Sequence, residues 1–183
     1  MTDLADRPEP PEFVPAPPAT TLAEARAAVV GSRYLLFEES FSLFDAGGFR
    51  PTFTWPALIF TSFWFVYRRM YLEAALIFLV RLILERMFIA SVLATRSLAN
   101  TDLFLLIGFS FHLALAVTGR WLYWKAVDRR LELAMLRFPN DQDRALAWLK
   151  SKGGVDPLAV ILLVVVQFVI NKFWLGPLII GLL

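Results

Sequence analysis

Residues 103–119, LFLLIGFSFHLALAVTG, form an apolar run that holds no charged side chain. Two more runs, 52–67 and 158–170, share this property. Such runs are too apolar for an ordinary soluble domain, whereas a helix that crosses a bilayer needs about 20 mostly apolar residues. The sequence therefore predicts an all-α fold: a polytopic integral membrane helical bundle with amphipathic interfacial helices and a disordered N-terminal tail.

The composition fits this fold class and narrows the chemistry. Of the 183 residues, 58% are hydrophobic and 15% are aromatic, which suits lipid-facing surfaces and aromatic belts. The chain has no cysteine, so disulfides, thiolate metal sites and cysteine nucleophiles are excluded. The net charge of +2 gives no reason to expect nucleic acid as a partner.

The N-terminal part is expected to lie outside the bilayer core. Residues 1–20 contain six prolines and predict the disordered tail. Thr21 and Glu24 have the spacing of a capping box, which begins a short helix that Gly31 ends. A second helix follows, and its aromatic stripe consists of Tyr34, Phe37, Phe41 and Phe44. Residues 21–46 are therefore predicted to form amphipathic interfacial helices.

The rest of the chain alternates between membrane helices and one basic segment. Residues 52–124 are predicted to hold membrane helices, with full spans at 70–94 and 103–124. Residues 52–67 are short for a span, so a short span and a re-entrant helix remain alternatives. The basic helical loop at 125–153 is predicted to hold one helix from Lys125 to Phe138 and a second that starts near Asp141. A C-terminal membrane helix at 157–183 follows, with Asp156 as its N-cap and Pro157 in its first position.

Basic residues gather on one side of the predicted spans. Eight of the 18 Lys and Arg residues lie between Gly119 and Gly154, whereas the connection 95–102 holds only Arg96. Because positively charged loops stay in the cytoplasm, the 120–153 loop is expected to be cytoplasmic.

One stretch carries a family pattern: Phe53-x-Trp55-x-Ala57-x-x-Phe60, then Phe63-Trp64-x-x-Tyr67-Arg68-Arg69-Met70-Tyr71-x-x-Ala74. It resembles the signature W-x-A-F-F…W-x-x-Y-R-K-M-Y of an uncharacterised family of small bacterial inner-membrane proteins. The resemblance covers roughly 34–154, and only 53–74 is specific; Pro56 and Arg69 depart from the signature. It implies a multi-pass protein of the bacterial inner (cytoplasmic) membrane, and it implies no reaction.

Ionisable side chains inside a span are costly and are often functional. The intramembrane polar cluster consists of Glu73, Arg81, Glu85, Arg86, Gln167, Asn171 and Lys172. Glu73, Arg81 and Glu85 share one helical face. Two interpretations remain open: a proton or ion relay or polar substrate cavity, and a structural network in which Glu85 pairs with Arg81 or with Lys172 of the last span.

Three other sets of residues are expected to have structural or binding roles in the membrane. The expected interface anchors are Trp55, Trp64, Tyr67, Arg68, Arg69, Tyr71, Trp121, Tyr123 and Trp124. The expected helix-packing positions are the small residues Ala90, Ala94, Ser110, Ala114 and Thr118. His112 is the one histidine, and it fits either a pigment or haem ligand or a hydrogen-bonding group within the bundle.

No catalytic or nucleotide-binding motif is present, and a single histidine cannot build a metal site. We therefore expect no enzyme activity and no cofactor. The leading hypothesis is an accessory or scaffold subunit of a larger membrane complex, with membrane lipids and other membrane subunits as partners. The alternatives are a small transporter or channel-like protein that uses the polar cluster, and a membrane adaptor that binds anionic lipid.

The side of the N-terminal tail can be tested with single cysteines at residues 10 and 130, because the natural chain has none. If 52–67 is re-entrant, an impermeant thiol reagent should label both positions from the cytoplasmic side only. Labelling of the two positions from opposite sides would instead establish 52–67 as a span.

Overall fold

The computed structural model describes residues 21–95 and 101–180, with side chains described as far as residue 172. The predicted tail 1–20, most of the connection 95–102 and the last three residues of the predicted C-terminal helix lie outside the described residues. The described residues form helices and no strand, which confirms the all-α prediction.

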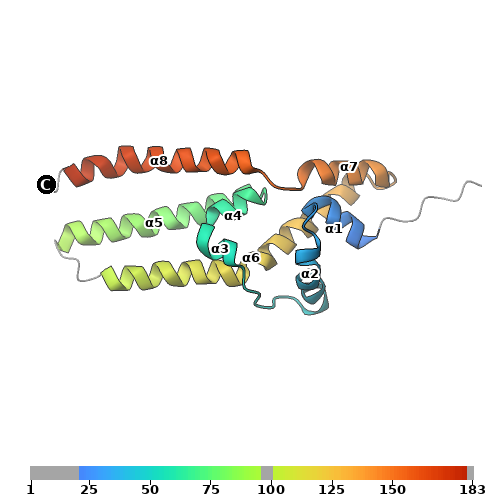
Figure 1. The fold of residues 1–183 in the computed structure, drawn as a ribbon, viewed down its shortest axis with the longest axis horizontal. Coiled ribbons are helices and arrows are strands. Elements are labelled where there is room, and N and C mark those ends of the chain that lie inside the picture. Colours follow the sequence, from blue (N-terminus) through green and yellow to red (C-terminus); the bar gives the residue numbers. More distant parts are fainter. Residues whose placement is uncertain (1–20, 96–100, 181–183) are drawn as a thin grey trace, which may run out of the picture.

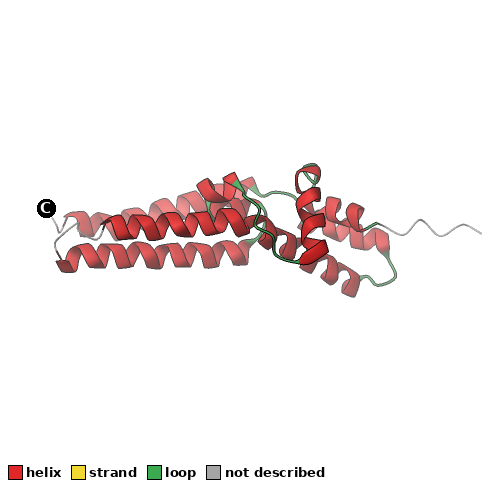
Figure 2. Cartoon of the chain, turned by 90° about the horizontal axis from the view of Figure 1, so that it is seen from below, coloured by secondary structure: helices red, strands yellow, loops and turns green. Residues whose placement is uncertain are grey.

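Eight helices make up the described chain. They are α1 (Leu22–Val30), α2 (Leu35–Gly47), α3 (Trp55–Phe60), α4 (Ser62–Tyr67), α5 (Tyr71–Thr95), α6 (Thr101–Arg137), α7 (Gln142–Lys152) and α8 (Pro157–Ile180). The molecule is elongated, as Figures 1 and 2 show: α5, α8 and the first half of α6 extend together toward one end. The short helices α1, α2 and α7 gather around the second half of α6 at the other end. We call this second end the head.

Helix α6 runs through both ends of the molecule without a break. Its 37 residues correspond to about 55 Å, nearly twice the ~30 Å hydrocarbon thickness of a bilayer. The span predicted at 103–124 and the helix predicted from Lys125 form one helix in the structure, which continues to Arg137. Between residues 101 and 138 there is no proline and no pair of adjacent glycines, so no helix-breaking signal precedes Pro139.

The head is held together by the aromatic stripe of α2. Phe37, Phe41 and Phe44 are buried, and the Phe37 and Phe41 rings lie 5.2 and 6.0 Å from the ring of Tyr123 in α6. Edge-on and tilted ring contacts of this kind add to the stabilisation from burial. The stripe predicted from spacing is therefore real, and it packs against α6.

Local signals at the helix ends behave as predicted. Thr21 and Glu24 form a reciprocal capping box, and Asp141 and Asp156 cap α7 and α8 through their carboxylates. Gly153 ends α7, and its backbone lies so close to Val29 of α1 that an added Cβ would sit 2.2 Å from the Val29 carbonyl oxygen. Only glycine permits this contact between α1 and α7, which the adjacent hydrogen bond from the Gly154 N–H to Val29 O (2.7 Å) reinforces.

Two helices are long and apolar enough to cross a membrane: α6, and the apolar part of the segment Gln142–Lys172, which lies in α8. Only 17% and 11% of their apolar windows are buried inside the protein, so neither behaves as the core helix of a soluble domain. Helix α5, the third expected span, is 25 residues long but carries four charged side chains. With these charges α5 is not apolar enough to be counted with the other two helices.

The segment 52–67 is not one helix. It divides into α3 and α4 at Thr61, whose φ of +42° is unfavourable for a β-branched residue. At its start, the Thr54 N–H donates to Ala116 O of α6 (2.9 Å), and Arg69, just after its end, donates from Nη1 to Ser151 O of α7 (2.9 Å). The segment therefore leaves α6 and returns to the head over a short distance.

A buried cation joins three helices of the head. Arg26 of α1 is 5% exposed, and its guanidinium binds Asp45 of α2 at 2.6 Å and Asp128 of α6 at 2.9 Å. The hydrogen bond to Asp45 raises the pKa of Arg26 and lowers the pKa of Asp45. No local sequence pattern predicts this cluster, because Asp45 and Asp128 lie 19 and 102 residues from Arg26 along the chain.

Replacing Arg26 with Met should therefore destabilise the head. The change leaves two half-exposed carboxylates without their cation, so we expect a loss of about 2–3 kcal/mol in the free energy of unfolding. Arg144→Met is the control, because it breaks only the exposed i,i+3 pair with Asp141 and should cost less than about 1 kcal/mol. Thermal unfolding in one detergent measures both, and equal losses would contradict the structural role of Arg26.

The same variant should change the acid sensitivity of the protein. Because the pKa of Asp45 is lowered in the folded state, its stabilising contribution is complete above the unfolded pKa of about 3.9 and is lost as pH falls through the folded value. Arg26→Met should flatten this acid-side loss, as read from unfolding curves below about pH 4. A parallel shift of the whole pH curve would argue against Asp45 as the titrating group.

Candidate functional site

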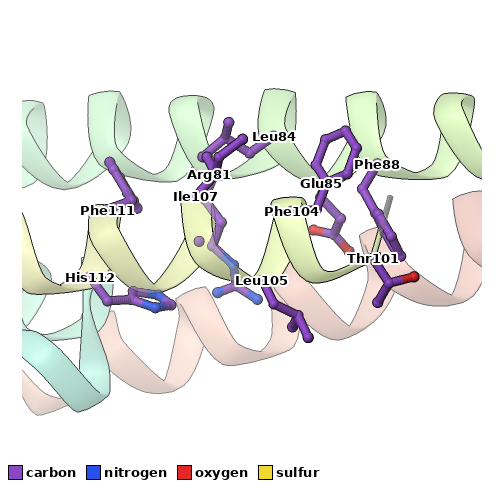
Figure 3. Close-up of a pocket in the computed structure, with 11 residues that line it drawn as sticks. Arg81, Leu84, Glu85, Phe88, Thr101, Phe104, Leu105, Ile107, Phe111 and His112 are labelled. Atoms are coloured by element: carbon purple, nitrogen blue, oxygen red, sulfur yellow. The ribbon is translucent and has the colours of Figure 1, made fainter. Parts of the chain in front are cut away.

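A polar pocket lies between α5 and α6, away from the head. Its volume is about 230 Å³, and its ionisable lining residues are Arg81 and Glu85 of α5 and His112 of α6 (Figure 3). Phe88 and Phe104 meet at 5.3 Å between ring centroids near one end. The remaining wall is mostly apolar, so a charged group in this pocket is poorly solvated.

Arg81 and Glu85 line the same pocket without pairing. Their i,i+4 spacing allows an ion pair, yet none links them within the described residues. In Figure 3 the Arg81 guanidinium lies toward His112, whereas the Glu85 carboxylate lies toward Thr101. Glu85 Oε2 and Thr101 Oγ1 are buried and have no hydrogen-bond partner in the structure. The pocket thus holds polar groups whose bonding capacity is unused.

Helix α8 brings further polar groups to the same level. The Tyr71 hydroxyl at the start of α5 donates to the Asp156 carboxylate at the start of α8 (2.6 Å), so the two helices begin side by side. They then run in the same direction (Figure 1). Arg81 and Gln167 are each ten residues along, about 15 Å from these starts. Gln167 donates to Asn171 at 3.2 Å and is itself buried, with Oε1 unpaired.

The other members of the expected polar cluster are placed apart from this pocket. Glu73 pairs with Arg129 of α6 at 2.8 Å, close to the head, and not with Arg81. Arg86 lines a separate apolar groove of about 390 Å³ with Ile170 of α8. Lys172 is exposed, and no ion pair joins it to Glu85 within the described part of the chain. Arg129 and Thr101 are not among the predicted cluster residues, because both lie in α6, whereas the predicted members lie in α5 and α8.

The expected interface anchors divide into buried and exposed groups. Trp64, Arg68 and Tyr123 are buried in the core, where the Arg68 guanidinium lies 4.6 Å from the Phe37 ring and 5.2 Å from the Tyr123 ring. Arg68 is thus held by cation–π contacts instead of extending outward. Trp55 and Tyr71 are exposed. The other four, Tyr67, Arg69, Trp121 and Trp124, are partly exposed.

The small-residue stripes face outward. Ser110 and Ala114 of α6 are exposed, and Thr118 is half-buried with its hydroxyl bonded to Ala114 O at 2.7 Å. Ala90 and Ala94 of α5 are exposed as well. These positions do not bring helices of this chain together, so they remain available for another helix.

The described residues contain no group of three or more His, Cys, Asp or Glu side chains that could hold a metal ion. The one ring contact of His112 is to Phe111, at 6.1 Å between centroids, among the described residues. This arrangement can hold a polar group or a partner side chain.

Comparison with known proteins gives one match. Residues 19–129, which include the signature region 53–74, match a family model described as a protein of unknown function, DUF2628. No curated protein and no solved structure matches the chain. The match extends from just before α1 to Arg129 of α6, so α7 and α8 lie outside it.

Two carboxylates of α5 should respond in opposite ways to removal of charge. Glu85→Leu should raise the free energy of unfolding by about 1 kcal/mol or more, because it removes a buried carboxylate oxygen that has no partner. Glu73→Gln should lower it by up to about 1 kcal/mol, because it breaks a pair whose arginine is 56% exposed. Thermal unfolding in detergent tests both, and destabilisation by Glu85→Leu would indicate a partner for Glu85.

Proposed function

The chain belongs to the DUF2628 family of proteins of unknown function, and from that premise we propose that it is a non-enzymatic multi-pass protein of the bacterial inner membrane. In this proposal it serves as an accessory or scaffold subunit of a larger membrane complex. The head provides a cytoplasmic domain, and the long helices provide a surface for transmembrane helices of other subunits.

Membrane insertion is supported by the surfaces of the long helices. Large apolar side chains are exposed along all three, among them Leu76 and Ile83 of α5, Leu106 and Phe109 of α6, and Leu162 and Phe168 of α8. Water-exposed apolar surface on this scale is unusual for a soluble monomer. The charged helix α5 is included because it begins beside α8 and runs with it, so a bilayer that contains α8 also surrounds α5.

The charge distribution supports a cytoplasmic head. The head contains the Arg- and Lys-rich region 120–153, so the positive-inside rule assigns it to the cytoplasm. The two short helices α3 and α4 then form a re-entrant segment, because α2 before them packs in the head and Arg69 after them bonds to Ser151 of α7 in the head. On this topology α5, α6 and α8 are the three spans.

One observation carries the scaffold proposal: the outward direction of the small-residue stripe Ser110, Ala114 and Thr118. Small residues let two transmembrane helices approach closely, and packing replaces the hydrophobic effect as the source of affinity in lipid. Within this chain, α8 packs on α4 and does not cover the stripe. The stripe is therefore proposed as the docking face for a helix of another subunit.

The docking face can be tested by co-purification in mild detergent. The double variant Ser110→Leu/Ala114→Leu should release a membrane partner that co-purifies with the wild-type protein, because bulky side chains prevent close approach. Val165→Leu on the exposed surface of α8 is the control and should retain the partner. Both variants should fold, since all three positions are exposed. A wild-type protein that always runs alone as a monomer would contradict the proposal.

A transporter or channel-like function is a second candidate, because a specific observation favours it. The pocket between α5 and α6 contains Arg81, which forms no ion pair among the described residues, and a buried Glu85 oxygen that has no hydrogen-bond partner there. Such groups inside a span often belong to ion or proton pathways. Proteoliposome flux that is abolished by Arg81→Gln and by Glu85→Gln would support it, whereas flux that survives both changes would exclude this pocket as the pathway.

A further inference from the structure

A second polar cavity lies where the head meets the long helices, and it differs from the first in charge. It has a volume of about 490 Å³, and it is lined chiefly by Arg69, Arg130, Lys152, Trp148, Tyr71 and Asp156. We call it the basic cleft. Its volume falls within the range of about 300–1,000 Å³ that is usual for sites of small molecules and headgroups.

The cations that line the basic cleft, Arg69, Arg130 and Lys152, outnumber its one lining carboxylate, Asp156, among the described residues. Arg69 donates from Nη1 to Ser151 O at 2.9 Å, and Arg130 donates from Nη2 to Arg69 O at 2.7 Å, so both bind neutral carbonyls. Among the described residues, neither they nor Lys152 form an ion pair. Asp156 is already engaged by the Tyr71 hydroxyl at 2.6 Å and by the Ala159 N–H at 2.9 Å.

This arrangement is unfavourable without an anion. Arg69 Nε and Arg130 Nη1 are buried, and neither has a hydrogen-bond partner among the described residues. Burial is the main cause that lowers the pKa of Arg130; the nearby charges of Arg69 and Arg129 act in the same direction, and that of Glu73 opposes them. Arg69 also has φ +58°, in the left-handed region that a residue with a long side chain seldom adopts. An anion with several acceptor oxygens would satisfy the unpaired donors and offset the repulsion between the cations.

The position of the cleft indicates the source of that anion. Tyr71 is the first residue of α5 and Asp156 caps α8, so the cleft opens at the level where two proposed spans begin. Headgroup phosphates lie at this level on the cytoplasmic face, and Trp148 and Tyr71 are the aromatic types that occur there. Guanidinium groups bind phosphate oxygens in a defined geometry, which suits them to such a site.

We propose that the basic cleft binds the phosphate of an anionic phospholipid from the cytoplasmic leaflet. The proposal uses the membrane topology given above, but it does not depend on docking to another subunit. Binding of the headgroup would fix the angle between the head and the bilayer, because Arg130 belongs to α6 and Lys152 to α7, two helices of the head.

The test compares two double variants of the full chain that remove the same charge from the same two helices. Arg130→Gln/Lys152→Gln alters the cleft, and Arg137→Gln/Lys150→Gln alters α6 and α7 outside it. Phosphatidylglycerol is titrated into detergent micelles of each protein, and the apparent Kd is read from thermal unfolding and from native mass spectrometry. Parallel titrations use phosphatidylcholine and inorganic phosphate at matched ionic strength.

We expect the cleft variant to bind phosphatidylglycerol about 20-fold more weakly than the wild type, and the control variant to stay within about twofold. If the double variant does not fold, Lys152→Gln alone changes an exposed side chain and should weaken binding about fivefold. Equally weak binding of phosphatidylglycerol by both double variants would show that diffuse electrostatic attraction accounts for the effect, and it would overturn the proposal. Stabilisation by inorganic phosphate equal to that by phosphatidylglycerol would overturn the lipid as the source. A wild-type chain that stays soluble without detergent would contradict the membrane topology instead.

Discussion

The unbroken helix α6 is the constraint on which the rest of the molecule depends. A helix satisfies its own backbone hydrogen bonds, so it can pass from an apolar environment to an aqueous one without leaving donors or acceptors unpaired. Because α6 is about 55 Å long, its second half would extend beyond a bilayer that surrounds the first half, and this second half is the central element of the head. Helices α1, α2 and α7 pack on it, so the position of the head relative to the long helices follows from one continuous element.

Among the described residues, charged side chains have compensating contacts in the head and lack ion-pair partners in two other places. In the head, Arg26 is surrounded by carboxylates and Arg68 by aromatic rings, so both buried cations have compensating contacts. Farther along, Arg81 and Glu85 line one pocket without pairing, and the cations of the basic cleft bind only carbonyls. Uncompensated charge in a low dielectric is unfavourable, so these two places are where an external group gains most by binding.

The sequence predicted what depends on neighbours in the chain. The capping box of Thr21, the aromatic stripe of α2 and the cap at Asp156 all follow from spacings of a few residues, and the structure contains each of them. Contacts between segments that lie far apart in the sequence could not be predicted from such spacings. The pair of Glu73 with Arg129 and the burial of Arg68 depend on how α4 and α5 pack against the head. Helical spacing grouped Glu73 with Arg81 and Glu85, since all three lie on one face of α5.

The range of the family match adds a final structural point. It covers α1 to most of α6, a unit in which the α2 stripe and the Arg26 cluster are already complete. Helix α7 joins this unit by packing on α1 and α6, with Gly153–Gly154 against Val29. Helix α8 joins it by packing on α4 and through the bond between Asp156 and Tyr71. The basic cleft lies along this seam, with Arg69 inside the matched range and Lys152 beyond it. A bound headgroup phosphate would therefore add one more link between the last two helices and the family unit.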